Sequence, residues 1–188
     1  QQVVIAEAVV KSWVGKSFHD THAYLMQVCH EEAVIANIRK AREQYIYQCL
    51  QDGSLHAMPY ALDALQAAKE YGYQTGLATS SLKKRSVAIL GHLELLSYLD
   101  IPVFADDVEK LKPYPDLYLH VLKQANCSAQ EAIAFEDSLT GAQAAATAGI
   151  FTVLIPDLSF SDVEQTCPHY QYAKNLSVVR DMLKQLDK

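Results

Sequence analysis

Residues 132–149 read AIAFEDSLTGAQAAATAG. The apolar run at 132–135 predicts a short buried strand, and the polar residues that follow mark its end. Residues 140–148 predict a helix directly afterwards. A buried strand that passes at once into a helix is typical of a parallel sheet covered by helices.

The same alternation continues on both sides of this stretch, from Pro59 to the end of the sequence. The predicted strands lie at 74–78, 102–105, 132–135 and 151–155. The predicted helices lie at 60–71, 82–90, from about 116, at 140–148 and from about 176 to 186. This order predicts an α/β fold with helices on both faces of a parallel sheet.

The first 55 residues have a different pattern, with helical spacing of apolar residues and no convincing strand. The apolar spacing predicts a first helix that ends before Gly15. Ser17 is placed to cap a second helix that ends near residue 28, and a third helix is predicted at 31–50. The turn residues at 51–54 end that helix. We therefore expect a helical domain at 1–57 and an α/β core at 58–188.

Composition excludes several classes of protein. The formal charge of −6 disfavours a surface for nucleic acid or another polyanion. No apolar run is long enough to span a bilayer, so we expect no membrane partner. The four cysteines are far apart and form no CxxC pair, which favours reduced thiols and a cytoplasmic location.

Polar residues follow the predicted strands, where an open α/β sheet binds its ligands. Thr79 and Ser80 come after the first strand, and a hydroxyl beside free backbone N–H groups suits a phosphate oxygen. An ordinary helix cap is the alternative. Lys112 follows the second strand and precedes Pro113, which restricts its backbone. A restricted lysine can neutralise a phosphate, although most lysines are simply solvated.

Two adjacent carboxylates, Glu136 and Asp137, follow the strand at 132–135. Adjacent carboxylates repel each other unless a cation lies nearby, and their oxygens suit Mg²⁺. Alternatively, Asp137 or Ser138 caps the helix at 140–148, and both interpretations can hold together.

Three motifs follow three successive predicted strands: LATSS at 77–81, KPYPD at 112–116, and FEDS at 135–138 with GAQAA at 141–145. Together they resemble the haloacid dehalogenase superfamily, in its β-phosphoglucomutase-like and phosphatase branch. The resemblance covers essentially the whole sequence. It implies a Rossmann-like core with an α-helical cap domain, and we expect a monomer or a weak homodimer.

The resemblance also implies a Mg²⁺-dependent phosphatase that acts on a small phosphorylated metabolite. An aspartate on the first strand of the family attacks the phosphoryl group, and water hydrolyses the resulting aspartyl-phosphate. By the matching positions, Thr79 and the Ser80 amide hold phosphate oxygens and Lys112 neutralises them. Asp137 is implied as a metal ligand, and Glu136 as a ligand or the partner of one.

One expected motif is absent, because Asp-x-Asp occurs nowhere in the sequence. The pair Asp106 and Asp107 falls in the stretch before Lys112 and does not replace it. We expect the first strand and part of the cap to be missing, about three or four dozen residues. The strands at 74–78 and 132–135 should then lie two strand spacings apart, roughly 9–10 Å, without pairing.

The opening helices carry the remaining candidates. Lys16 and Ser17 fall where relatives have a substrate-facing turn, although a solvated lysine is nearly as plausible there. Phe18 replaces an arginine of the β-phosphoglucomutases, which favours hydrolysis over a sugar phosphomutase. His19 and His22 are spaced to share a metal, but no third ligand is nearby, so we predict no metal there.

Other functions share parts of this pattern. A sugar phosphomutase has every motif quoted above and differs mainly in its cap. A haloacid dehalogenase has the lysine but needs no metal, and the acidic pair at 136–137 argues against it. A non-catalytic binding module remains an alternative because the nucleophile is absent.

Overall fold

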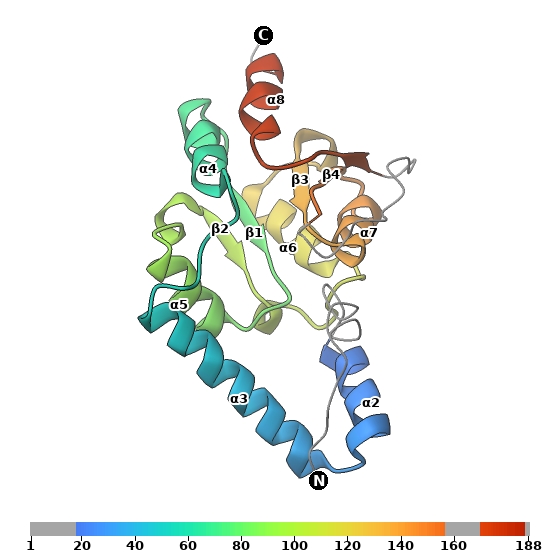
Figure 1. Ribbon diagram of the computed structural model, residues 1–188. Helices are drawn as coiled ribbons and strands as arrows, with labels where there is room; N and C mark the ends of the chain where they lie inside the picture. The colour runs from blue at the N-terminus through green and yellow to red at the C-terminus, as the bar shows by residue number, and fades with distance from the viewer. Residues whose placement is uncertain (1–17, 157–169, 187–188) are drawn as a thin grey trace. The chain divides into compact units, whose positions relative to one another are not determined.

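The computed structural model describes residues 18–156 and 170–186 (Figure 1). The chain divides into two compact units, Gln1–His56 and Ala57–Lys188. The helix predicted before Gly15 lies outside the described residues, as do Lys16 and Ser17. No helix within the described ranges is both long enough and apolar enough to cross a membrane.

The described part of the first unit contains α2 (Phe18–Cys29) and α3 (Glu32–Gln51), both as predicted. They contact each other and bury Leu25 of α2 and Ile35 of α3. The predicted turn after α3 is also present, with the Ser54 N–H donating to Asp52 Oδ1 at 2.9 Å. That this unit acts as a cap stays a prediction.

His22 of α2 is held by two residues of α3. Arg39 Nη2 lies 2.8 Å from His22 Nδ1, and His22 Nε2 lies 3.3 Å from Glu32 Oε2. Both ring nitrogens therefore serve the packing of α2 on α3.

The second unit alternates between helices and strands, as the sequence predicts. Its helices are α4 (Ala61–Glu70), α5 (Lys83–His92), α6 (Asp116–Ala125), α7 (Leu139–Thr147) and α8 (Val178–Leu186). Its strands are β1 (Gly76–Ala78), β2 (Ile101–Val103), β3 (Ile133–Glu136), β4 (Phe151–Leu154) and β5 (Gln171–Tyr172). Single 3₁₀ turns lie at Leu96–Tyr98, Ala105–Asp107 and Ala129–Glu131. Of these strands, β5 was not predicted.

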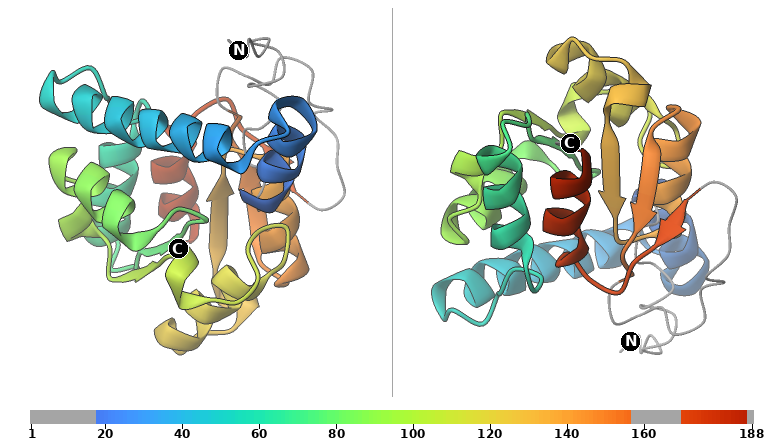
Figure 2. Two further views of the ribbon diagram at one scale, coloured as in Figure 1. Left: turned by 90° about the horizontal axis from the view of Figure 1, so that it is seen from below. Right: turned by 90° about the horizontal axis from the view of Figure 1, so that it is seen from above.

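The strands form two parallel sheets in the described part of the unit. β1 pairs with β2, and β4 lies between β3 and β5 (Figures 1 and 2). Gly76 is opposite Ile101 in the first sheet, and Ile133 is opposite Phe151 in the second. No ladder joins β1 to β3 within the described ranges, so the expectation that these strands do not pair is confirmed.

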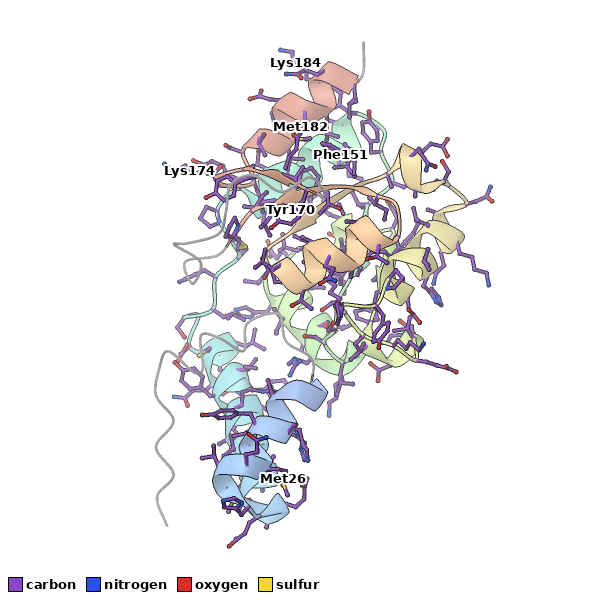
Figure 3. The ribbon with its side chains drawn as sticks, turned by 90° about the vertical axis from the view of Figure 1, so that its right-hand side faces the viewer. Met26, Phe151, Tyr170, Lys174, Met182 and Lys184 are labelled. Carbon is purple, nitrogen blue, oxygen red and sulfur yellow. The ribbon has the colours of Figure 1, made fainter. Side chains whose placement is uncertain are left out.

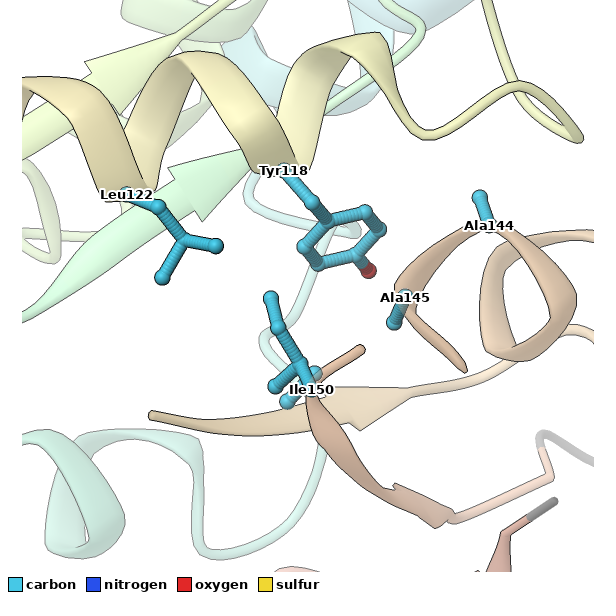
Figure 4. Close-up of a cluster of buried hydrophobic side chains, with 6 residues drawn as sticks. Tyr118, Leu122, Ala144, Ala145 and Ile150 are labelled. Atoms are coloured by element: carbon cyan, nitrogen blue, oxygen red, sulfur yellow. The ribbon is translucent and has the colours of Figure 1, made fainter. Parts of the chain in front are cut away.

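Helix α6 packs against both sheets. Tyr118 and Leu122 of α6 share a buried cluster with Ala134 of β3 and residues of α7 (Figure 4). Leu117 of α6 packs in a second cluster with Ile101 and Val103 of β2. Ala78, the last residue of β1, contacts both clusters. The ends of β1 and β3 are therefore connected through one packed core.

The opposite face of β3 is covered by α4 and α8. Ala134 points into the α6 cluster, whereas the next residue, Phe135, packs with Val179 and Leu183 of α8. Successive side chains of a strand point to opposite faces, so β3 has helices on both sides. Lys184 lies on the exposed side of α8 (Figure 3). The predicted α/β fold class is confirmed.

Candidate active site

The loops that follow β1 and β2 are connected by backbone hydrogen bonds. The Lys83 N–H at the start of α5 donates to Asp106 Oδ2 at 2.7 Å. The Ala105 N–H donates to the Ser81 carbonyl at 3.1 Å. Asp107 Oδ2 accepts from the Phe104 N–H at 2.8 Å. The acidic pair at 106–107 therefore fixes two loops, which gives it a structural role.

Thr79 extends the β1–β2 ladder and begins a tight turn. Its N–H donates to the Val103 carbonyl at 3.1 Å, and its Oγ1 accepts from the Ser81 N–H at 3.1 Å. Thr79 and Ser80 are half-buried. Within the described residues no hydrogen bond joins Thr79 to Lys112 or Asp137. The roles of Thr79 and Ser80 toward phosphate stay predictions.

Lys112 is held in place by its neighbours in the chain and by its side-chain partner. The preceding residue, Leu111, packs against the buried cluster around Val103. The Lys112 side chain is only 12% exposed, and its ammonium forms an ion pair with Glu136 Oε1. Lys112 therefore connects the loop after β2 to the end of β3 and is not a solvated lysine.

Glu136 is the last residue of β3 and its side chain is 6% exposed. Strand alternation places it on the same face as Ala134, toward α6 and α7. Its Oε1 accepts from the Lys112 ammonium and from the Tyr118 hydroxyl. Burial raises the pKa of the Glu136 carboxyl, and these two donors act in the opposite direction by stabilising the carboxylate.

Tyr118 is the functional neighbour that the sequence did not identify. Its place in α6 marks it as a core residue, because Leu122 lies one turn later on the same face. No sequence signal gives its contact with Glu136, which spans 18 positions. Burial, and then the nearby Glu136 carboxylate, raise the pKa of the Tyr118 phenol, so the hydroxyl keeps its proton and donates.

Asp137 and Ser138 have separate roles. Ser138 Oγ caps α7 by accepting from the Gly141 N–H at 3.1 Å. Asp137 is exposed, and its carboxylate has no hydrogen-bond or ion-pair partner among residues 18–156 and 170–186. Of the two proposed caps, Ser138 therefore fills the position, which leaves the Asp137 oxygens available for a ligand.

The carboxylates at the end of β3 are of a kind that binds Mg²⁺, but they do not surround a metal site by themselves. In the described ranges, no group of three or more His, Cys, Asp or Glu side chains is placed to hold a metal ion. Mg²⁺ is commonly bound by one or two carboxylates, waters and substrate phosphate oxygens. The free carboxylate of Asp137 satisfies that pattern, whereas Glu136 is already engaged with Lys112 and Tyr118.

Comparison with known proteins gives a family and two similar enzymes. Residues 4–155 match the family model described as haloacid dehalogenase-like hydrolase. The Bacillus subtilis protein YhcW, named as a phosphatase, is 42% identical over 93 residues, which are 50% of this chain and 42% of YhcW. The phosphorylated carbohydrates phosphatase of Thermotoga maritima is 38% identical over 92 residues, 49% of this chain and 43% of that enzyme. The matched parts thus span less than half of the length of these relatives.

A similar fold is found in a solved structure, the β-phosphoglucomutase of Clostridium difficile. The TM-score is 0.77 at 18% sequence identity, with 98% of this chain and 82% of that chain covered. At this identity the similarity concerns the fold alone.

Proposed function

Because the chain belongs to the haloacid dehalogenase-like hydrolase family, we propose that the whole protein is a Mg²⁺-dependent phosphatase of small phosphorylated metabolites. One observation carries the proposal: Lys112 and Glu136 form a buried ion pair beside the free carboxylate of Asp137. A fixed cation and a free carboxylate at one strand end suit a phosphate and its metal. The names of the two relatives support a phosphatase, and one of them supports phosphorylated carbohydrates as substrates.

Each residue has a proposed role in binding the phosphoryl group. The Thr79 hydroxyl and the Ser80 amide hold phosphate oxygens beside the start of α5. Lys112 neutralises the charge of the phosphoryl group, and Glu136 keeps the lysine in position. Asp137 is the metal ligand, and Glu136 is its neighbour within the site and not a second ligand.

The metal and the nucleophile complete this proposal. When bound, Mg²⁺ would orient the phosphate. Its positive charge would also reduce the repulsion between the negative phosphate and the carboxylate that attacks it. The nucleophilic aspartate, which forms the aspartyl-phosphate, is not among the residues of this sequence, because no Asp-x-Asp motif occurs in it. A role of Lys16 and Ser17 toward the substrate is part of the proposal, and both residues lie outside the described ranges.

Hydrolysis of p-nitrophenyl phosphate by the full-length protein tests the proposal. We expect turnover with Mg²⁺ and none in EDTA. Asp137→Asn should require a much higher Mg²⁺ concentration, since it removes the charge on the ligand while keeping the size of the side chain. Full-rate turnover in EDTA contradicts the proposal. A panel of sugar phosphates then compares substrates and detects any mutase product.

A further inference from the structure

The carboxylate of Glu136 is enclosed by three groups from three different elements. The Lys112 ammonium comes from the loop after β2, and the Tyr118 hydroxyl comes from α6. The third is the backbone of Gly141 in α7, where an added Cβ atom would overlap Glu136 Oε2 and Cδ. A buried carboxylate is stable only when donors satisfy its oxygens. The position of this carboxylate is therefore set by its surroundings.

Tyr118 contacts both members of the Lys112–Glu136 ion pair. Its hydroxyl donates to Glu136 Oε1, the same oxygen that accepts from Lys112. Its ring faces the lysine, with Nζ 5.3 Å from the ring centroid, which is within the range of a cation–π interaction. The three side chains form a closed triangle in which each contacts the other two.

Packing alone does not account for the hydroxyl of Tyr118. The ring fills a cluster made of Leu122, Ala134, Ala144, Ala145 and Ile150 (Figure 4). A phenylalanine ring would fill the same space with the same apolar contacts. The hydroxyl adds one interaction, its bond to Glu136, so its contribution is to that carboxylate.

We propose that Tyr118 is a positioning residue of the phosphate site, whose hydroxyl fixes Glu136 so that Glu136 fixes the Lys112 ammonium. The proposal rests on the phosphatase function proposed above. With the hydroxyl removed, Glu136 Oε1 keeps only Lys112 as a donor, and the carboxylate loses one of the two bonds that orient it. Electrostatic stabilisation of a phosphoryl group depends on a cation that is already in place. Loss of the hydroxyl therefore weakens phosphate binding and slows turnover without touching the substrate.

Tyr118→Phe tests this in the full-length protein, with Tyr114→Phe as the matched control. Tyr114 lies two positions from Lys112, is exposed, and has Lys110 Nζ 5.2 Å from its ring centroid. In Tyr118→Phe we expect kcat to fall about tenfold, as displaced catalytic groups cost this much or more. The inhibition constant of inorganic phosphate should rise about threefold or more, a loss in the range of one typical intramolecular hydrogen bond. This constant does not depend on the folded fraction, so a merely structural effect leaves it unchanged.

A double-mutant cycle tests the route through Glu136. If Tyr118 acts by holding Glu136, then Tyr118→Phe in a Glu136→Gln background should lower kcat by less than about twofold. The proposal is overturned if the two effects multiply, or if Tyr118→Phe equals Tyr114→Phe in kcat and in phosphate inhibition.

A third measurement decides the proposal even if the protein hydrolyses nothing. A buried, hydrogen-bonded ammonium group gives a slowly exchanging ¹H–¹⁵N signal, which Lys112→Ala assigns by its loss. We expect the signal in wild type and in Tyr114→Phe, and a shifted or missing signal in folded Tyr118→Phe. An unchanged signal in Tyr118→Phe overturns the positioning role. Absence of all phosphatase activity, with the signal behaving as expected, overturns the proposed function alone.

Discussion

At the scale of single residues, the adjacent carboxylates of the acidic pair have different surroundings. Glu136 ends β3 and points inward to Lys112 and Tyr118, whereas Asp137 lies one residue beyond the strand and is exposed. The sequence predicts that this pair lies at the end of a strand, because it follows an apolar run. It does not predict the division of roles, because that depends on where the strand ends and on the contact with Tyr118 in α6.

Gly141 lies against the Glu136 carboxylate, so a side chain at this position should destabilise the protein. It lies in the first turn of α7, where alanine normally stabilises a helix by about 1 kcal/mol relative to glycine. Here the added methyl group would overlap the Glu136 carboxylate. We therefore expect Gly141→Ala to lower the free energy of unfolding by about 1–3 kcal/mol, as overpacked sites do.

Gly91→Ala is the matched control for this prediction. Gly91 is an exposed residue of α5, and an added Cβ atom meets nothing within 4 Å. We expect this change to stabilise the protein by roughly 0.5–1 kcal/mol. Urea unfolding of both variants gives the comparison, and stabilisation by Gly141→Ala would show that the carboxylate does not need the space.

At the scale of elements, the sequence predicts the start of each described α-helix of the second unit to within two or three residues, but it misses β5. Strong apolar periodicity and flanking turn residues define the helices. β5 is only the pair Gln171–Tyr172, both exposed, and it exists because β4 offers a free edge to pair with. A strand that short has no periodicity to detect.

Asp106 connects two of these elements, which leads to a prediction about its role. Its carboxylate accepts from the Lys83 N–H and so caps α5 from the loop after β2. Asp106→Ala should lower the free energy of unfolding by about 1 kcal/mol, as the loss of a helix cap does. Phosphatase activity per folded molecule should stay near wild type. Loss of all activity in a folded Asp106→Ala protein would instead assign this aspartate to catalysis.

A network between α4 and the start of β2 predicts a pH effect on stability. Lys69 and the Thr75 N–H both donate to Asp100 Oδ2, and chiefly the lysine lowers the pKa of Asp100 to about 2. The usual value for aspartate is about 3.9. Because the folded pKa is the lower one, the contribution of this group is fully present above about pH 4 and is lost as the pH falls toward 2.

Asp100→Asn should therefore remove part of the loss of stability between about pH 4 and pH 2. Urea unfolding at several pH values measures it. The carboxylate is exposed at 42%, so solvent screening keeps the effect small. An identical pH profile in wild type and variant would mean that the network contributes nothing in solution.

At the scale of the whole molecule, the second unit holds two parallel sheets that share α6 but no ladder within the described residues. The sequence motifs predict this separation, since the resemblance places a further strand between the two. The distance between β1 and β3 stays a prediction, and so does the presence of a further strand between them. Among the residues that the structure describes, the edge of β1 away from β2 and the edge of β3 away from β4 carry no ladder, so each can pair with another strand.

The arrangement of the strands explains why the site can be predicted only in part from the sequence. Motifs after β1, β2 and β3 identify the loops, because the carboxyl ends of parallel strands are where α/β folds bind ligands. The contact between Lys112 and Glu136 follows from those loops meeting, which the sequence does predict in outline. The position of Thr79 relative to that pair also depends on how both sheets pack against α6, which no local pattern encodes.

The central claim is that Lys112 is a preorganised cation of a phosphatase site, and Lys112→Ala tests it most directly. The measurement is kcat/KM for p-nitrophenyl phosphate in the full-length protein with Mg²⁺. Lys123→Ala, at an exposed position in the last turn of α6, is the control. We predict a loss of about a hundredfold or more for Lys112→Ala, as for removal of one preorganised donor, and no change for the control. A folded Lys112→Ala protein that retains wild-type kcat/KM would contradict the account.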